Sequence, residues 1–152
     1  MKGRRRPRPA VVLRVPSRTE FLAAIRDTAK RVAEFAGCEA GTAEQVALAV
    51  DEAATNVIEH AYGGAADRRI ELSFLLTPEE LRVEIADDGQ PVDTGAVPDV
   101  DLRRYASERR RGGFGVHLMG RIMDTVSFRR TARGNVCCLV KKLPAGDARV
   151  AR

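Results

Sequence analysis

The stretch Glu52-Ala-Ala-Thr-Asn56-Val-Ile-Glu-His60-Ala-Tyr62 carries the strongest chemical signal in the chain. Glu52 and Asn56 are four residues apart, so in a helix their side chains lie one above the other on the same face. Asparagine is a mediocre helix former, and its position inside a helix therefore requires an explanation. A carboxylate and a carboxamide one turn apart can hold a hydrated Mg²⁺ and activate a nucleophile; the alternative is an ordinary solvated helix face.

The residues around this stretch predict a helix with one apolar face. The helix is expected to begin at Thr42, which Gln45 follows three residues later, and to end before Gly63. The apolar residues that recur at helical spacing are Val46, Val50, Ala53, Val57 and Ala61.

Upstream, the pattern predicts a short strand followed by another helix. Apolar residues alternate over 11–15, and Pro16 ends the strand. Ser17 or Thr19 can cap the first helix, and Glu20 follows Ser17 by three residues, as in a capping box. Gly37 is expected to end that helix.

Downstream, two pairs of strands enclose a long polar segment and one further helix. The segment over residues 87–113 is rich in Gly and Arg, and such a long loop in a compact domain is usually functional or disordered. The expected strands are 70–76, 81–86, 125–130 and 136–143, and the expected helix is 116–123. Strands linked as hairpins favour an α+β sandwich with a mixed, mostly antiparallel sheet and helices on one face.

Charge and composition narrow the domain organisation and the classes of partner. The chain has 26 Lys+Arg against 21 Asp+Glu, and five of the basic residues lie within the first eight. This distribution predicts a disordered basic tail over 1–9, one domain over 10–144 and a polar tail over 145–152, with contact to nucleic acid or an acidic partner as the alternative for the basic tail. Nucleic acid is not the expected partner, because the rest of the chain is neutral.

Two further features of the sequence concern where in the cell the protein is expected to be found. No stretch approaches the ~18–20 apolar residues of a membrane-spanning helix, so no membrane association is expected. Cys38, Cys137 and Cys138 are odd in number and lack the spacing of metal ligands, which indicates reduced thiols in a cytoplasmic protein.

Two other motifs could bind a nucleotide. Asp87-Asp-Gly89 ends a strand, and a buried Asp at such an exit can accept a hydrogen bond from an exocyclic amine such as that of adenine; an ordinary Asp-Gly turn is the alternative. Arg111-Gly-Gly113-Phe-Gly115-Val116 opens a helix, where glycines and free N–H groups favour a phosphate. The pattern is not a P-loop, because no Gly-Lys-Ser/Thr follows.

Taken in this order, the three motifs resemble those of the GHKL ATPases, named for gyrase, the chaperone Hsp-ninety, histidine kinases and mismatch-repair proteins. Within that superfamily the chain is most similar to the bacterial anti-sigma-factor serine kinases of partner-switching systems. The resemblance covers roughly residues 15–143. It implies a two-layer α/β sandwich of the Bergerat type with a long ATP lid.

The resemblance also implies a role for each motif residue. Glu52 would be the general base or a polarising carboxylate for the attacking hydroxyl, and Asn56 would ligate the Mg²⁺ that bridges the ATP phosphates. Asp87 would recognise the adenine amine, and Gly89 would allow close approach beneath the base. Residues 93–111 would form the lid. The other expected nucleotide-binding residues are Arg111, Gly113, Phe114, Gly115 and Val116.

The activity implied by the resemblance is that of an ATP-dependent protein serine/threonine kinase and anti-sigma factor. Its substrate would be a serine of a STAS-type antagonist, its second partner a sigma factor, and the apolar residues of the first helix permit a homodimer. Two departures from the family pattern favour the alternative, a nucleotide-gated binding module with little or no kinase activity. The segment after Gly89, Gln-Pro-Val-Asp, lacks the second glycine that many relatives carry, and Asn135 stands where threonine is common.

Overall fold

The structure is a computed structural model that describes residues 7–91 and 113–144. Its strands form a single five-stranded sheet in the order β1-β2-β3-β5-β4. In chain order the elements are β1 (Val11–Pro16), the 3₁₀ turn η1 (Thr19–Phe21), α1 (Leu22–Phe35), α2 (Ala40–Asn56), the π-helical turn η2 (Val57–Ala61), β2 (Arg69–Leu76), β3 (Glu80–Asp87), α4 (Gly113–Ile122), β4 (Thr125–Thr131) and β5 (Gly134–Lys142).

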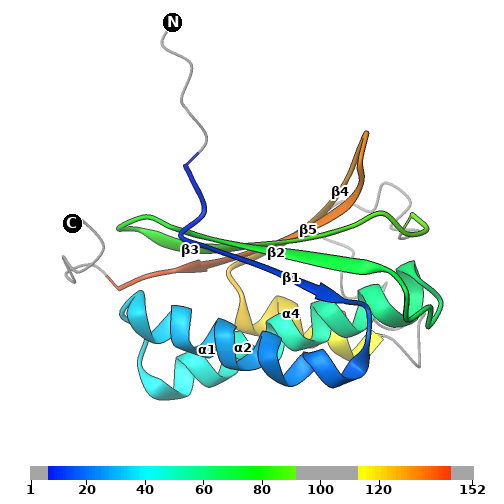
Figure 1. Cartoon of the computed structure of the whole chain (residues 1–152). Coiled ribbons are helices and arrows are strands. Elements are labelled where there is room, and N and C mark those ends of the chain that lie inside the picture. Colours follow the sequence, from blue (N-terminus) through cyan, green and yellow to red (C-terminus); the bar gives the residue numbers. More distant parts are fainter. Residues whose placement is uncertain (1–6, 92–112, 145–152) are drawn as a thin grey trace, which may run out of the picture.

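The molecule has two layers, with α1, α2 and α4 all on one face of the sheet (Figure 1). All four strand pairs are antiparallel. In the helical layer α2 contacts both α1 and α4, so it is the central helix. The predicted α+β sandwich with helices on one face is therefore confirmed. The sheet was predicted to be mixed and mostly antiparallel, and among the described strands it is antiparallel throughout.

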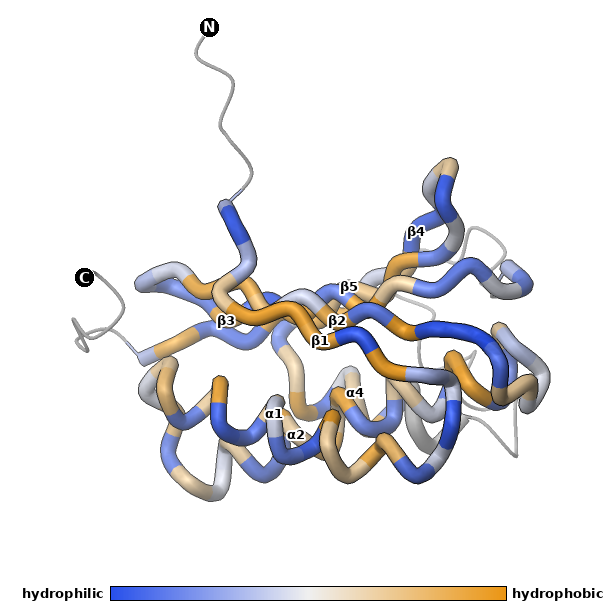
Figure 2. The backbone as a smooth tube through the Cα atoms, in the orientation of Figure 1, coloured by the Kyte–Doolittle hydropathy of each residue, from blue (hydrophilic) through white to orange (hydrophobic). Residues whose placement is uncertain are grey.

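The core forms where the alternation of the strands meets the apolar faces of the helices. Leu81, Val83 and Ile85 of β3 are fully buried, while the residues between them are only partly buried. This alternation of hydrophobic and hydrophilic residues can be followed along the strands in Figure 2. Each such side chain contributes about 1.5–3 kcal/mol through burial, so the apolar pattern holds the two layers together.

The predicted capping box at Ser17 is wrong. The first helix begins later, after η1, and the Ser17 side chain caps nothing. Ser17 is 1% exposed, and its hydroxyl donates to the Ala65 carbonyl at 2.6 Å and accepts the Arg68 N–H at 3.1 Å. A tertiary contact with the segment before β2 therefore uses the hydroxyl that the local pattern assigned to the helix.

The central helix also differs from its prediction at both ends. It begins at Ala40 rather than Thr42, with Glu39 in extended conformation as the N-cap residue. The α-helix ends at Asn56, and the predicted last turn is the π-helical turn η2. Turns of this kind inside helices occur frequently at functional sites.

Several predictions fall on residues outside the described part of the chain. These are the lid over 93–111, Arg111, and most of the two tails at 1–9 and 145–152. The domain limits 10–144 stay a prediction. Within the described ranges no helix is both long and apolar enough to cross a membrane, and Cys38, Cys137 and Cys138 are free thiols.

Candidate functional site

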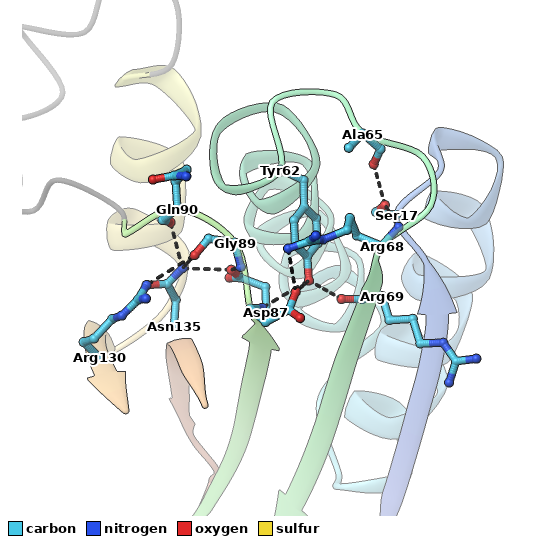
Figure 3. A network of polar contacts seen from close by, with 11 residues as sticks. Ser17, Tyr62, Ala65, Arg68, Arg69, Asp87, Gly89, Gln90, Arg130 and Asn135 are labelled. Atoms are coloured by element: carbon cyan, nitrogen blue, oxygen red, sulfur yellow. Dashed lines mark hydrogen bonds and ion pairs between the residues drawn. The ribbon is translucent and has the colours of Figure 1, made fainter. Parts of the chain in front are cut away.

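Asp87 occupies the last position of β3, where the strand leaves the sheet. The residue is 8% exposed, and its Oδ1 accepts the Gly89 N–H at 2.9 Å and the Asn135 Nδ2–H at 2.8 Å (Figure 3). No described residue makes a hydrogen bond to Oδ2. Burial raises the pKa of the Asp87 carboxyl, whereas the two donated hydrogen bonds oppose the rise. The predicted buried carboxylate at a strand exit is thus present, with one oxygen bonded and the other open to a donor.

Asn135 of β5 and Arg130 of β4 make hydrogen bonds that hold the Asp87 loop in place. Asn135 faces Asp87 in the β3–β5 register, and its Nδ2 also donates to the Gln90 carbonyl at 2.8 Å. Arg130 donates to Asn135 Oδ1 at 2.9 Å and to the Gly89 carbonyl at 3.2 Å. Sequence reasoning missed these roles, because only knowledge of the β3–β5 register could have placed Asn135 opposite Asp87.

Gly89 lies directly against the end of the central helix. A Cβ atom on Gly89 would lie 2.3 Å from the Ala61 carbonyl oxygen and 2.9 Å from the Tyr62 ring. The next residue, Gln90, donates its N–H to the same Ala61 carbonyl at 2.8 Å. The loop that carries Asp87 therefore meets the Glu52–Tyr62 motif at Ala61. The described residues thus supply a reason for Gly89 that is independent of the predicted approach of a base.

Gly134, at the end of the β4–β5 turn, also lies very close to the backbone of Asp87. Gly134 has φ +134°, a conformation that L side chains rarely adopt, and a Cβ there would lie 2.1 Å from the Asp87 carbonyl oxygen. Glycine allows the β4–β5 turn to pass this close to the end of β3. The position of Asn135, one residue on, depends on that approach.

Tyr62 links the end of η2 to the start of β2 and to Asp88, the residue after β3. Its buried hydroxyl accepts the Asp88 N–H at 3.2 Å and lies within hydrogen-bond distance of the Arg69 carbonyl and, at 3.0 Å, of Asp88 Oδ1. Arg68 lies over the ring, with Cζ 5.4 Å from the ring centroid. Burial and the neighbouring carboxylates raise the pKa of Tyr62 to about 12. A pocket of about 510 Å³ opens beside this contact, between the end of η2 and residues 88–91.

The raised pKa of Tyr62 predicts a loss of stability in alkali. The folded protein holds this proton more tightly than the unfolded chain, whose value is 10.0, so the contribution is complete below pH 10 and is lost as the pH rises through about 12. The free energy of unfolding of the wild type should therefore fall more steeply across this window than that of Tyr62→Phe. Urea unfolding at several pH values measures both slopes. Parallel curves would contradict the assignment.

Glu52 and Asn56 lie on the last two turns of α2. Burial, and then the charges of Asp51 and Glu59, raise the pKa of the Glu52 carboxyl. Asp51 turns toward α1, where its Oδ2 is 3.6 Å from Arg26 Nη1. Neither Glu52 nor Asn56 makes a side-chain hydrogen bond to a residue that the structure describes, so these oxygen atoms remain available to a ligand.

The glycine-rich motif lies at the start of α4, which begins at Gly113 and packs against α2. The start is three residues earlier than the pattern predicted. Gly113, Phe114, Gly115 and Val116 thus form the first turn, whose N–H groups have no partner within the helix. Arg111 lies outside the described residues. The structure therefore brings the Asp87 loop to the end of the Asn56 helix and places α4 alongside that helix.

The donor set fits a weakly ligated hard cation. No group of three or more His, Cys, Asp or Glu side chains within 7–91 and 113–144 could hold a metal. Mg²⁺ is usually bound through one or two protein oxygens, with waters and substrate phosphates as the other ligands. An Asn56 carboxamide beside a Glu52 carboxylate has this chemistry.

Comparisons with known proteins show the family of the chain. The family model described as histidine kinase-like ATPase domain matches residues 15–141. The serine-protein kinase RsbW of Halalkalibacterium halodurans is 30% identical over 139 residues, which cover 88% of this chain and 83% of that protein. RsbW of Bacillus subtilis is 31% identical over 121 residues, with 76% and 75% covered.

A solved structure extends the likeness to the fold. A chain in the crystal structure of the SiaB-SiaC complex from Pseudomonas aeruginosa matches with a TM-score of 0.64 at 12% identity, and 90% of each chain is covered. At that identity the match concerns the fold alone. From the family model and the RsbW relatives together, the chain belongs to the histidine kinase-like ATPase family and, within it, to the group of the RsbW serine-protein kinases.

Proposed function

We propose that this chain is an ATP-dependent protein serine/threonine kinase of a partner-switching system. One observation carries the proposal: the loop after Asp87, whose carboxylate is bonded on Oδ1 only among the described residues, is hydrogen-bonded to Ala61, at the end of the helical segment that bears Glu52 and Asn56. The loop that carries the proposed adenine-binding residue is therefore bonded to the helical segment that carries the proposed metal ligand and general base. The identity of about 30% to RsbW serine-protein kinases supports phosphoryl transfer as the reaction.

Asp87 would select the base. Its Oδ2 accepts a hydrogen bond from the exocyclic amine of adenine, while Oδ1 is already saturated by two donors. The loop is fastened at Ala61 and at Asn135, so little ordering is needed when the base binds.

Asn56 and Glu52 would serve the phosphate end of the nucleotide. The Asn56 carboxamide oxygen would hold Mg²⁺, which when bound neutralises phosphate charge and aligns the phosphate oxygens. The first turn of α4 would face the phosphates with its free N–H groups, and Arg111 would add positive charge.

Glu52 would act as general base. One of its carboxylate oxygens takes the proton of the substrate serine hydroxyl. The serine oxygen bonds to the γ-phosphorus as the bond between that phosphorus and the ADP leaving oxygen breaks. The pKa of Glu52 is raised by burial and by Asp51, which brings it toward the range in which a carboxylate can accept a proton near neutral pH.

The proposed partners follow from the family. The phosphoacceptor is a serine of a STAS-type antagonist, and the sequestered partner is a sigma factor. The kinase works in the cytoplasm as a homodimer. The structural neighbour was solved as a complex of two proteins, which supports protein partners for this fold.

Removal of Asn56 should weaken nucleotide binding. Mg²⁺-ATP at about a hundred times its dissociation constant stabilises a fold by about 2.7 kcal/mol, or about 5–10 °C in a domain of this size. We expect that shift in the wild type and a much smaller one in Asn56→Ala, measured by thermal unfolding with and without ligand. Gln45→Ala removes an exposed amide from the same helix and should retain the full shift. Equal shifts in wild type and Asn56→Ala would contradict the metal-binding role.

Mass spectrometry separates the kinase from a nucleotide-gated binding module. A candidate antagonist incubated with the chain and Mg²⁺-ATP should gain the mass of one phosphate. Nucleotide-dependent binding of that antagonist without any gain in mass would favour the module. The altered residues after Gly89 and at position 135 motivate this alternative.

A further inference from the structure

The orientation of the Asn135 side chain is determined by its neighbours. Its Nδ2 is close to two strong acceptors, Asp87 Oδ1 and the Gln90 carbonyl, each at 2.8 Å, and lies 3.4 Å from the Gly89 carbonyl. Its Oδ1 is 2.9 Å from Arg130 Nη1. A guanidinium only donates hydrogen bonds, and a carbonyl oxygen only accepts them. With the amide reversed, its NH₂ group would face the donor Arg130 and its oxygen would face the acceptor oxygens, so every contact would be unfavourable.

We propose that Asn135, held in this orientation by Arg130, is the positioning residue that makes Asp87 select a 6-aminopurine over a 6-oxopurine. The inference rests on the proposed function, because it takes Asp87 as the group that meets the base. Asn135 touches no base itself in this scheme; it acts through the carboxylate of Asp87.

The selection follows from how the Asp87 carboxylate is bonded. With the Asn135 amide and the Gly89 N–H both donating to Oδ1, the side chain cannot rotate without losing two hydrogen bonds in a buried position. The same two bonds stabilise the charged form against burial. Oδ2 is therefore kept as an acceptor, which suits the amine of adenine and opposes the carbonyl oxygen of hypoxanthine.

Asparagine performs a task here that threonine could not perform alone. A threonine hydroxyl has one donor, whereas the Asn135 amide donates to Asp87 and to Gln90 at the same time. The amide thereby links the base-reading carboxylate to the backbone just beyond Gly89. Arg130 adds a second link by donating to the Gly89 carbonyl at 3.2 Å.

The test compares ADP with IDP, which differ at purine position 6 and undergo no phosphoryl transfer in this reaction. Isothermal titration of the full chain with each nucleotide and Mg²⁺ yields a ratio of dissociation constants. A hydrogen bond to a charged group corresponds to about a tenfold to hundredfold preference, and we expect the wild type to favour ADP by that factor. Asn135→Ala should lower the preference to about threefold or less, mainly through weaker binding of ADP.

Arg130→Met tests the same positioning role without changing Asn135. Its side chain is at the protein surface, so the fold should survive, and the ADP preference should fall in the same direction. Arg129→Met is the matched control, because Arg129 is the adjacent residue of β4 and contacts Glu84 at 3.7 Å rather than the Asp87 loop. It should retain the wild-type ratio. Thermal unfolding without nucleotide confirms that each variant is folded.

The outcomes separate the inference from the function beneath it. A wild type that prefers ADP, with the same ratio in Asn135→Ala and Arg130→Met, would overturn the positioning role and leave the proposed function standing. A wild type that binds both nucleotides equally would overturn the selection by Asp87. A wild type that binds neither would overturn the proposed function, and the inference with it.

Discussion

Glu52→Gln is expected to lower phosphoryl transfer to a protein substrate by at least about a hundredfold, because general base catalysis contributes about 10²–10⁴ to such a step. The substitution keeps the size of the side chain and removes only its ability to take the serine proton. The dissociation constant for Mg²⁺-ATP should stay within about threefold of the wild-type value, as expected for an interaction made in the transition state. Single-turnover transfer and nucleotide titration measure the two effects separately.

A control on the same helix isolates the role of position 52. Glu44 is an exposed glutamate of α2 paired with Lys30 at 2.5 Å, far along the helix from Asn56. Glu44→Gln should therefore leave transfer unchanged. If Glu52→Gln transfers phosphate at the wild-type rate, Glu52 is not the base and its raised pKa reflects only its surroundings. If both transfer and ATP binding fall together, Glu52 acts in binding instead.

Gly89→Ala is expected to destabilise the fold by about 3 kcal/mol, at the upper end of the cost of overpacking. The new Cβ would meet the backbone oxygen and carbon of Ala61 at 2.3 and 2.7 Å, and these atoms cannot move without disturbing η2. The hydrogen bond from Gln90 N–H to that oxygen would be strained as well. Urea unfolding should show the loss, and the melting temperature should fall by about 6–12 °C.

Gly41→Ala is the matched control for the added methyl group. Gly41 lies in the first turn of α2, and a Cβ there would meet nothing within 4 Å. This substitution should leave stability unchanged or raise it by up to about 1 kcal/mol, since alanine favours the helix. A Gly89→Ala variant as stable as the wild type would show that the loop can shift, and the fastening of Asp87 to η2 would then be weaker than its contacts suggest.

The fold class and the core could be predicted from the sequence because both depend on periodic patterns. The helical spacing of Val46, Val50 and Ala53 and the alternation in β3 place these residues in the core that the structure has. Such patterns record which face of an element is apolar, and that is enough to decide between helix and strand. The ends of the elements were less predictable, since an end depends on what the neighbouring chain offers to its free backbone groups.

The residues of the candidate site could be predicted from the sequence, but the contacts between their segments could not. Glu52, Asn56 and Asp87 were each identified from local residue chemistry, and their roles stay predictions. Gly89 was expected to make room for a base, whereas among the described residues it makes room for Ala61. Nothing in the local sequence around Gly89 names the residue on the other side of that contact.

Local residue patterns were enough to predict which segments are helices and strands, which faces are buried, and which side chains have the chemistry of a nucleotide site. These properties depend on residues a few positions apart, where spacing alone fixes the geometry. The packing of distant segments determines that Asn135 bonds to Asp87, 48 residues away, and that Ser17 bonds to Ala65 rather than capping its own helix. The physical reason is that a buried polar group bonds to whichever partner the packed layers bring within 3 Å, and sequence spacing does not record that distance.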